Sequence, residues 1–311
     1  MPDKQMSIER ARPNTPTIRP FTLAIAGDSA AGKTTLAGGL VEALGADRST
    51  SICTDDYHRY DRTERKDKPF TALHPSCNYV QIIEQHLQLI ATGQPILKPV
   101  YNHETGTLDR PQLVEPKEFV IVEGLLPLHT KLMRSCFDVT VYLDPPEDVR
   151  RGWKLSRDTG ARGYTKEQVL AELARREPES EEFIRAQRAS ADIVLQFAPV
   201  AGREDPPNTP LSATLLLRPT VPHPPLVRIV EDTTAIHIKM MRDDDRPVDA
   251  LHVHGYAPRV ETDQVEKRIW DHIGLEQEMP PDLGALGPGK RSAPLAVSQL
   301  ILLSHLLSTQ N

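Results

Sequence analysis

The chain has 311 residues, of which 39% are hydrophobic and 26% charged, with a formal net charge of −6. This composition can build one large α/β domain or two smaller ones, and the negative charge argues against a non-specific nucleic-acid binder. No apolar run is long enough to span a membrane, and the N-terminus lacks the pattern of a secretory signal. Cys53, Cys77 and Cys136 are too few and too scattered for a disulfide framework, so we expect a cytoplasmic protein.

Short apolar runs alternate with helix-like stretches after a polar, proline-containing segment, residues 1–19, which we expect to be a flexible lead-in. The expected strands are residues 21–27, 49–53, 119–124, 139–144 and 191–197. The expected helices between them are residues 33–45, 78–93 and 147–159. This alternation predicts an α/β fold with a mainly parallel sheet flanked by helices over residues 20–200.

A capping box at Thr165 and Gln168 predicts a helix that runs through Arg176 and ends at Pro178, with residues 160–164 as the preceding loop. From about residue 200 the composition changes to a proline-rich linker, which is followed by short β-like apolar runs separated by turn residues. The expected strands there are residues 211–219, 225–230, 235–240 and 249–255, and the expected helices are residues 262–273 and 294–307. Residues 201–311 are therefore predicted to form a smaller α+β extension packed on the first unit.

Residues 27–34, GDSAAGKT, match the phosphate-binding pattern G-x-x-x-x-G-K-[ST] and lie between an expected strand and an expected helix. The predicted α/β fold is therefore of the P-loop NTPase type. In such a loop, backbone N–H groups surround the phosphates, Lys33 neutralises the β and γ oxygens, and the Thr34 hydroxyl holds Mg²⁺. Glu123 follows a neighbouring strand and is the expected second metal ligand or water-positioning group. The predicted ATP-binding residues are Gly27, Asp28, Ser29, Ala30, Ala31, Gly32, Lys33, Thr34 and Thr35.

The stretch CTDDYHRYDRTERK, residues 53–66, places two carboxylates and several basic residues after the strand next to the phosphate loop. Adjacent residues at a strand end point to opposite sides, so only one aspartate can face the transferred phosphoryl group as a general base. His58, Arg59 and Arg62 suit an acceptor that already carries a phosphate, because such an acceptor needs a cationic pocket. The basic run weighs against a neutral nucleoside as the acceptor.

The motifs GDSAAGKTT, TDDYHRYDRTERK, TALHP, KPVYNHETG, IVEGL and WKLSRD, in this order, resemble the plant and cyanobacterial branch of the phosphoribulokinase and uridine kinase family. The resemblance covers roughly residues 21–198 and implies Mg²⁺- and ATP-dependent phosphorylation of the C1 hydroxyl of D-ribulose 5-phosphate. By this resemblance Asp55 is the general base and His58 and Arg62 bind the sugar phosphate. Tyr101 and His103 match a segment that lines the acceptor pocket.

Four residues of WKLSRDTGARG match the family's lid, which closes over ATP and contributes charge to the transferring phosphoryl group: Lys154, Arg157, Asp158 and Arg162. The resemblance makes Arg157 and Asp158 candidate catalytic residues and Lys154 and Arg162 candidate substrate-binding residues. Spacing alone agrees in part, because the first three share one helical face while Arg162 lies beyond Gly160. A helix-surface ion pair is the competing interpretation.

The chain departs from plant-type relatives at Ala31, where they have a second thiol. The regulatory disulfide cannot form with Cys53, so we expect no thiol-regulated partner assembly; the resemblance suggests a homodimer. His252-x-His254 has metal-ligand spacing but no evident third ligand, which favours a structural role. Two alternatives stay open: a kinase of another sugar phosphate or of a nucleoside such as uridine, and a nucleotide-binding regulator without catalysis.

Overall fold

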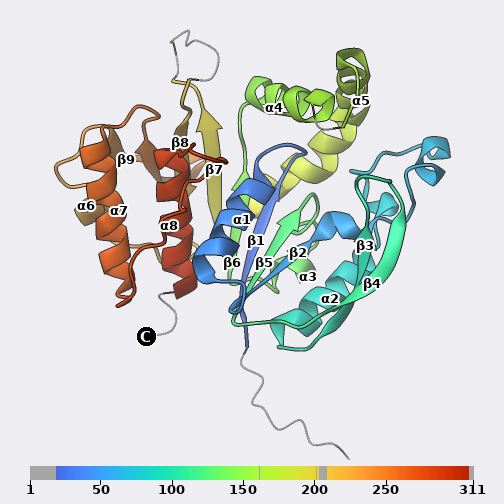
Figure 1. Cartoon of the computed structure of the whole chain (residues 1–311), viewed down its shortest axis with the longest axis horizontal. Coiled ribbons are helices and arrows are strands. Elements are labelled where there is room, and N and C mark those ends of the chain that lie inside the picture. Colours follow the sequence, from blue (N-terminus) through green and yellow to red (C-terminus); the bar gives the residue numbers. More distant parts are fainter. Residues whose placement is uncertain (1–18, 161, 201, 203–208, 308–311) are drawn as a thin grey trace, which may run out of the picture.

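A computed structural model of the chain describes residues 19–160, 162–200, 202 and 209–307. An eight-stranded sheet forms the centre of the molecule, in the order β2-β5-β1-β6-β7-β8-β10-β9 (Figure 1). Its parallel strands are β2 (Ser49–Cys53), β5 (Phe119–Gly124), β1 (Phe21–Gly27), β6 (Val139–Leu143) and β7 (Ile193–Ala198). The predicted α/β class with a mainly parallel sheet is confirmed.

The strands after residue 200 continue this same sheet. β8 (Ser212–Leu217) pairs antiparallel with β7, and β10 (Arg246–Val253) and β9 (Ile236–Asp243) extend the sheet beyond it. The predicted lead-in, apart from Arg19, and most of the predicted linker lie outside the described residues. The domain boundary near residue 200 stays a prediction. The strands before and after it, β7 and β8, are neighbours in one sheet.

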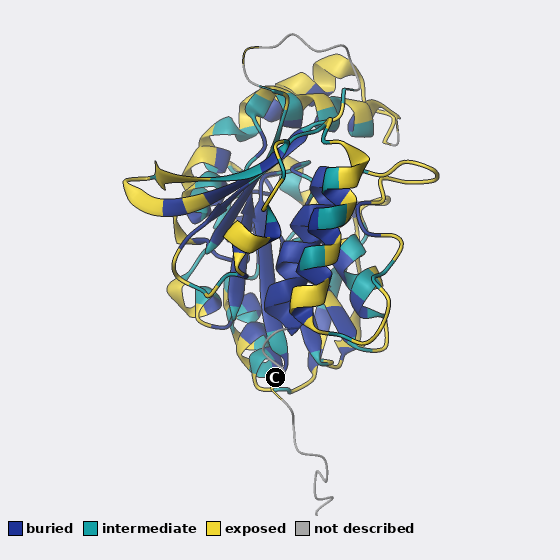
Figure 2. Cartoon of the chain, turned by 90° about the vertical axis from the view of Figure 1, so that its left-hand side faces the viewer, coloured by how far each residue is buried: buried dark blue, intermediate teal, exposed yellow. Residues whose placement is uncertain are grey.

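Helices cover both faces of the sheet, which explains why its central strands are apolar on both sides. In β5, Phe119 and Ile121 belong to the core shared with α1 (Lys33–Leu44), α7 (Arg259–Ile273) and α8 (Ala293–Leu307). The alternate residues Val120 and Val122 face α2 (Val80–Ala91) and α3 (Lys131–Arg134). Figure 2 shows the buried strands between helices whose outer sides are exposed.

Helix α8 is buried along its length from Pro294 to Leu307. It approaches α1 closely because α1 has a glycine at the contact: a Cβ atom on Gly39 would lie 2.0 Å from the Gln299 amide nitrogen. The Gln299 amide oxygen in turn accepts a hydrogen bond of 2.7 Å from the Gly284 backbone N–H. None of the helices in the described ranges is long and apolar enough to cross a membrane.

Two elements lie above the carboxyl ends of the parallel strands: α4 (Glu147–Gly160) and α5 (Lys166–Glu179) (Figure 1). The predicted capping box at Thr165 and Gln168 is present. The predicted end at Pro178 is wrong, because α5 continues to Glu179 and passes into a π-helical turn, Ser180–Ile184. A proline this late removes only one helical hydrogen bond, and the Ser180 N–H bonds to the carbonyls of Arg176 and Glu177. Gly160, predicted to lie in the loop, is the last residue of α4.

The predicted strand over residues 225–230 is also wrong. Leu226–Ile229 form a short helix, α6, directly after Pro224 and Pro225. Leu226 and Ile229 are buried, whereas Val227 is 79% exposed. Buried residues three positions apart fit a helix, and proline is favoured at a helix start.

A two-stranded hairpin, β3 (Ile96–Tyr101) and β4 (Leu108–Val114), has no counterpart among the predicted elements. The β3 strand contains Pro99 at a register shift between Lys98 and Val100, which breaks its pattern. β3 contacts the turn after β2, so the hairpin forms one wall of the region described next.

Candidate active site

The phosphate loop connects β1 to α1 at the carboxyl edge of the sheet. Ala30 and Gly32 have left-handed backbone conformations, with φ values of 66° and 97°, which turn the loop toward the helix N-terminus. The Lys33 side chain is buried and its Nζ donates to the Asp28 carbonyl oxygen at 3.0 Å. The loop thus has the cradle shape that its sequence predicts, with an ammonium group lying across it.

Thr34 and Glu123 meet at the start of α1. The Thr34 hydroxyl donates to Glu123 Oε1 at 3.0 Å. Burial raises the pKa of Glu123, and the Lys33 ammonium opposes that rise. A hydroxyl and a carboxylate held together are hard oxygen donors of the kind that Mg²⁺ prefers, so the residues present fit this ion.

Asp55 and Asp56 lie in a 3₁₀ turn, Thr54–Tyr57, that follows β2. Asp55 Oδ1 accepts a 3.0 Å hydrogen bond from the Leu125 N–H, at the end of β5. This contact needs glycine at position 124, where a Cβ atom would lie 1.9 Å from the Thr54 hydroxyl and 3.1 Å from Asp55 Oδ1. Asp55 is therefore placed beside Glu123 and the phosphate loop.

Asp56 points the other way. Its carboxylate forms a buried ion pair with Lys98 and accepts a 3.1 Å hydrogen bond from the Tyr101 N–H. Asp56 thus fastens β3 to the turn after β2. The two adjacent carboxylates have different partners, which leaves Asp55 as the candidate base.

His58 is buried and uncharged near neutral pH, since burial lowers its pKa to about 4. Its Nδ1 lies 2.7 Å from Asn78 Oδ1, and the Asn78 amide nitrogen donates to the carbonyls of Ala72 and His74. Asn78 is therefore the acceptor, and His58 Nδ1 carries the hydrogen. Its Nε2 is left as an acceptor for a hydroxyl, which differs from the cationic role that the basic run suggested.

Three arginines of the 53–66 stretch contact the residues around His58 and the β3–β4 hairpin, which together are called the acceptor side below. Arg59 packs on the Tyr79 ring and Arg65 on the Tyr101 ring, 5.2 and 4.9 Å from the ring centroids. Arg59 Nε and Arg65 Nη1 are buried without a hydrogen-bond partner. Arg62 donates to the backbone carbonyls of His103 and Glu104, so it ties this stretch to the β3–β4 turn.

Arg65, Asn78 and Lys98 are the residues here that sequence reasoning missed. Arg65 lies three positions after Arg62 in the quoted motif, which was the available signal. The rings of Tyr101 and His103, both predicted, are in edge contact with centroids 5.0 Å apart. Tyr101 also contacts His58, at 4.8 Å.

Three of the four lid candidates converge on the carboxylate of the fourth, Asp158. Asp158 pairs with Lys154 and Arg157 at 2.8 Å and with Arg162 at 3.4 Å. Burial opposes ionisation of Asp158, but the hydrogen bonds from Arg157 and Lys154 hold its pKa below the usual value. Lys154 and Asp158 are buried rather than on the helix surface, and Arg157 Nη2 is buried without a partner.

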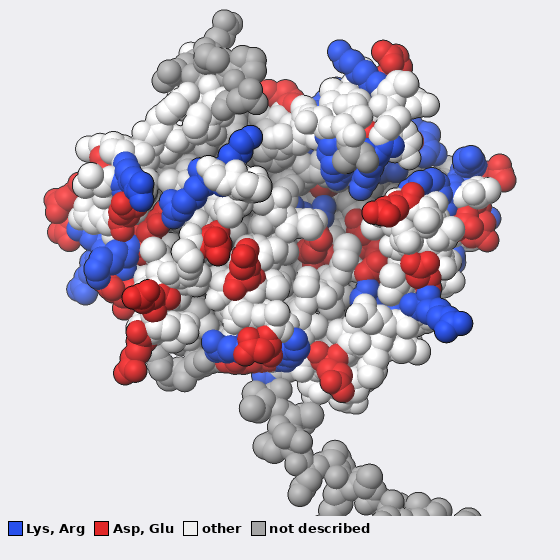
Figure 3. Space-filling model, viewed as in Figure 1, with Lys and Arg blue, Asp and Glu red and all other residues white. Residues whose placement is uncertain are grey.

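The lid charges face the acceptor side. The positive charge of Arg62 contributes to a lowered pKa of Arg162, after the larger effects of burial and of Arg157. Figure 3 shows basic side chains gathered beneath α4 and α5 at a hollow in the surface. A separate cleft of about 300 Å³ lies where β6 and β7 end, and its lining residues are Asp144, Pro145, Pro146, Glu147, Arg185, Gln196 and Ala198.

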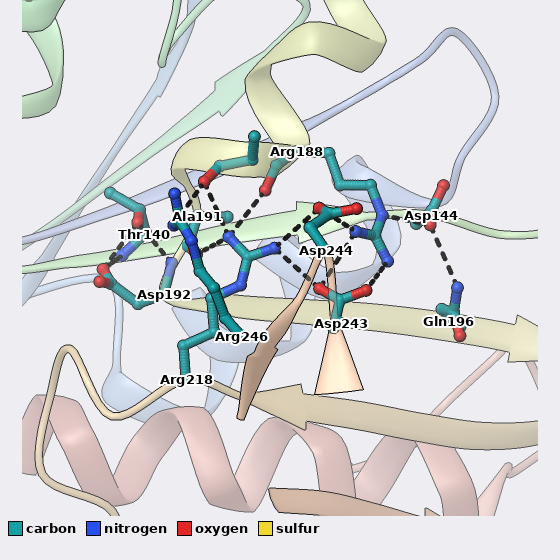
Figure 4. A network of polar contacts seen from close by, with 11 residues as sticks. Thr140, Asp144, Arg188, Ala191, Asp192, Gln196, Arg218, Asp243, Asp244 and Arg246 are labelled. Atoms are coloured by element: carbon teal, nitrogen blue, oxygen red, sulfur yellow. Dashed lines mark hydrogen bonds and ion pairs between the residues drawn. The ribbon is translucent and has the colours of Figure 1, made fainter. Parts of the chain in front are cut away.

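A second group of arginines, away from the acceptor side, is paired with carboxylates (Figure 4). Arg188 joins Asp144, after β6, to Asp243 at the end of β9, with both contacts at 2.8 Å. Arg218 is 2% exposed and pairs with Asp243 at 2.8 Å. It also donates to the carbonyls of Arg188, Ala189 and Ala191, which leaves only its Nε unpaired.

The histidine pair of β10 has a third neighbour. His237 of β9 lies opposite His252, with ring centroids 5.1 Å apart, and His254 lies 6.4 Å from His252. The His252 Nδ1 is 3.0 Å from the Thr214 hydroxyl. Across the part of the chain that the structure describes, no group of three or more His, Cys, Asp or Glu is arranged to hold a metal ion.

The cysteines carry no disulfide: Cys53, Cys77 and Cys136 are free. Burial raises the pKa of the Cys53 thiol well above its usual value, and the nearby Asp55 and Glu123 carboxylates add to this. A thiol of this kind is protonated at neutral pH and is a poor nucleophile.

Known proteins match the region that contains these residues. The phosphoribulokinase of Synechocystis sp. is 42% identical over 187 residues, which are 60% of this chain and 56% of that protein. The chain thus spans little more than half the length of this relative. A uridine kinase of Geobacillus sp. is 31% identical over 185 residues, which are 57% of this chain and 86% of that protein.

A phosphoribulokinase structure from Rhodobacter spheroides matches with a TM-score of 0.59 and 18% identity, over 81% of this chain and 96% of that one. At this identity the likeness concerns the fold alone. The model of the phosphoribulokinase / uridine kinase family matches residues 22–202, more than half of the chain. The chain therefore belongs to the phosphoribulokinase and uridine kinase family.

Proposed function

We propose that the chain is an ATP-dependent kinase that transfers the γ-phosphoryl group to the C1 hydroxyl of D-ribulose 5-phosphate and yields ribulose 1,5-bisphosphate and ADP. One observation carries the proposal. Asp55, Lys33 and the Thr34–Glu123 pair meet at one edge of the sheet, beside arginines whose buried nitrogens lack protein partners. Buried cationic nitrogens without partners are expected where an anionic ligand binds.

The chemistry follows from these positions. Asp55 accepts the proton of the C1 hydroxyl as its oxygen bonds to the γ-phosphorus, and the bond from that phosphorus to the ADP oxygen breaks. Lys33 stabilises the charge on the phosphate oxygens, and Thr34 and Glu123 would hold Mg²⁺. When bound, the ion neutralises charge that develops on the transferred group.

The acceptor would lie between the 53–66 stretch, the β3–β4 hairpin and the lid charges. Arg59 and Arg65 supply positive charge for its phosphate, and His58 Nε2 accepts a hydrogen bond from a sugar hydroxyl. Lys154, Arg157, Asp158 and Arg162 form the lid cluster, in which Arg157 Nη2 is buried without a protein partner and could donate to a ligand. This division of roles favours a phosphorylated acceptor over a nucleoside.

We also propose that the chain forms a homodimer, as the family resemblance suggests. We further propose that its activity is not controlled by a disulfide, because Ala31 leaves Cys53 without a neighbouring thiol. Kinase activity should therefore be equal after oxidation and after reduction with dithiothreitol.

The proposal is tested by ADP release from the purified protein with Mg²⁺ and ATP, comparing ribulose 5-phosphate, ribose 5-phosphate, uridine and no acceptor. We expect turnover with ribulose 5-phosphate alone. Faster turnover with uridine would assign the chain to the nucleoside branch. ATP binding without turnover on any acceptor would support the regulator alternative and overturn the kinase assignment.

A further inference from the structure

Two neighbouring side chains at the junction of α5 and the π-helical turn contact two different loops: Glu179 ends α5 and Ser180 begins the turn. In a helix, consecutive residues point about 100° apart, so Glu179 and Ser180 face different surroundings. Glu179 contacts Thr71, and Ser180 contacts Asp28. These partners lie 108 and 152 residues earlier in the sequence. π-Helical turns occur frequently at functional sites.

The Glu179 contact holds the loop that supports the acceptor side. The Thr71 N–H donates to both carboxylate oxygens, at 2.9 and 3.0 Å, and the Thr71 hydroxyl donates to one of them. The loop then runs to Asn78, which accepts the hydrogen bond of His58 and whose own amide is held by the Ala72 and His74 carbonyls. A displacement of Thr71 would therefore reach His58.

The Ser180 contact holds the phosphate loop. The Ser180 hydroxyl, in a side chain that is 2% exposed, donates to Asp28 Oδ2. The same carboxylate lies 3.5 Å from Arg150 of α4, which also donates to the Ser29 carbonyl at 3.0 Å. Asp28 Oδ1 accepts from the Ser29 N–H at 2.6 Å, so the backbone of the phosphate loop is fixed through this residue.

The turn is packed firmly enough to transmit a displacement. Ile184 is fully buried in a small apolar cluster with Leu73, Leu125 and Leu126, and these come from the acceptor-side loop and the segment after β5. In the 3₁₀ helix that follows the turn, Arg185–Ser190, the Gln187 amide donates to the Leu125 carbonyl at 2.7 Å and accepts from the Leu128 N–H at 2.9 Å. The turn therefore contacts all three segments that surround the proposed phosphoryl-transfer site.

We propose that Glu179 and Ser180 are positioning residues that couple the phosphate loop to the acceptor-side loop, residues 71–78. Nucleotide binding fixes Asp28, Ser180 follows it, and Glu179 then holds Thr71 and the loop that orients His58. The effect on turnover rests on the proposed kinase function, whereas the coupling between the loops does not. Coupling of this kind is reciprocal, so an occupied acceptor site also favours nucleotide binding.

The first test is amide hydrogen exchange over residues 71–78, with and without MgADP, in the wild type and in Ser180→Ala. We expect MgADP to slow exchange in the wild type and to lose at least half of this protection in Ser180→Ala. MgADP itself should still bind, with affinity reduced by about tenfold at most. The matched control is Ser190→Ala, an exposed serine that should transmit the protection unchanged.

The second test uses Glu179→Gln and steady-state kinetics with ribulose 5-phosphate. We expect the acceptor KM to rise about tenfold while the ATP KM stays within about twofold. Glu181→Gln, an exposed neighbour, is the control. Thr71→Val weakens the same contact from the other side and should give the same pattern, even where Glu179→Gln folds poorly.

The coupling is overturned by exchange in residues 71–78 that does not respond to MgADP in the wild type, or by full protection in Ser180→Ala. Equal rises in both KM values in Glu179→Gln would also overturn it, since they indicate a general loss of structure. A chain that shows the MgADP response but no turnover with ribulose 5-phosphate would keep the coupling and refute the proposed acceptor.

Discussion

The two arginine groups of this molecule differ in what satisfies them. On the acceptor side, Arg59 and Arg65 stack on tyrosine rings and keep buried nitrogens without partners. In the network near the C-terminal strands, Arg188 and Arg218 are held by Asp243 and by backbone carbonyls. A buried guanidinium that is neutralised by carboxylates stabilises the fold, and one that lacks them is available to an anionic ligand. Substitutions in the two groups should therefore change different properties.

The largest effect is expected at the carboxylate beside the acceptor-side group. Asp55→Asn should lower kcat by about 10³-fold, because a positioned general base contributes about 10²- to 10⁴-fold. MgADP binding should persist, which calorimetry can verify. Asp56→Asn is the contrast, because it leaves Lys98 buried without its carboxylate. This variant should have a lower melting temperature, and its kcat should fall much less than that of Asp55→Asn. Equal losses of kcat in both variants would remove the distinction between the two aspartates.

Arg218→Met should destabilise the protein by about 3 kcal/mol, because it removes one of the two arginines that pair with Asp243 and the donor to three backbone carbonyls. Urea unfolding measures this loss. Arg246→Met in the same network should cost less than about 0.5 kcal/mol, since Arg246 is exposed and has a single long contact of 3.4 Å. A small effect of Arg218→Met would show that the network adds little to stability.

Arg65→Met should act on binding more than on folding. Loss of a charge-assisted contact of about 1.5–3 kcal/mol predicts a rise of about 10- to 100-fold in the acceptor KM. Some stability should be lost with the hydrogen bond from Arg65 Nη2 to the Tyr101 hydroxyl, but less than in Arg218→Met, because Arg65 Nη1 has no protein partner to lose. Arg110→Met on the exposed β4 strand is the matched control. A fall in stability with an unchanged KM would place Arg65 in the structural group.

Each region also contains a buried histidine with a lowered pKa: His58 on the acceptor side and His305 in α8. The stability of the protein should therefore depend on pH. Burial lowers the pKa of His305 to about 4, and the nearby His223 adds to the shift. An unfolded histidine has a pKa of about 6.5, so the unfolded state binds more protons between these values. The free energy of unfolding should therefore fall as the pH drops from about 6.5 to about 4, by at most about 1.4 kcal/mol per pH unit for this group.

Compared with the wild type, His305→Gln should reduce that pH dependence by up to one proton. Urea unfolding at several pH values from 7 to 4 provides the measurement. An identical slope in the wild type and in His305→Gln would mean that His305 is protonated in the folded protein.

The sequence predicts most of the sheet because its strands are short apolar runs with buried positions on both faces, as in residues 119–124. The prediction from sequence is wrong at residues 225–230, which are rich in β-forming residues. There Pro224 and Pro225 precede a short helix instead. The β3–β4 hairpin is missed because Pro99 and exposed β4 residues hide its pattern.

The residues of the candidate site also fall into two groups, those that the sequence predicts and those that it does not. Lys33, Thr34, Glu123 and Asp55 are predictable because each has a fixed place relative to a strand end or a helix start. Asn78, Glu179 and Ser180 depend on contacts between distant segments, for which a single sequence gives no signal. Arg65 was within the motif, but its role depends on the Tyr101 ring, which the unpredicted hairpin brings near.

The antiparallel junction between β7 and β8 limits how the chain can be shortened. In the whole chain, Ile193, Val194 and Leu195 are completely buried and hydrogen-bonded to the next strand. A fragment that ends near residue 200 would present this strand as a bare, apolar edge, which is a template for aggregation. Expression of the kinase segment alone should therefore give inclusion bodies or mixed oligomers, and a usable shorter version needs a charged or proline-containing replacement for β8.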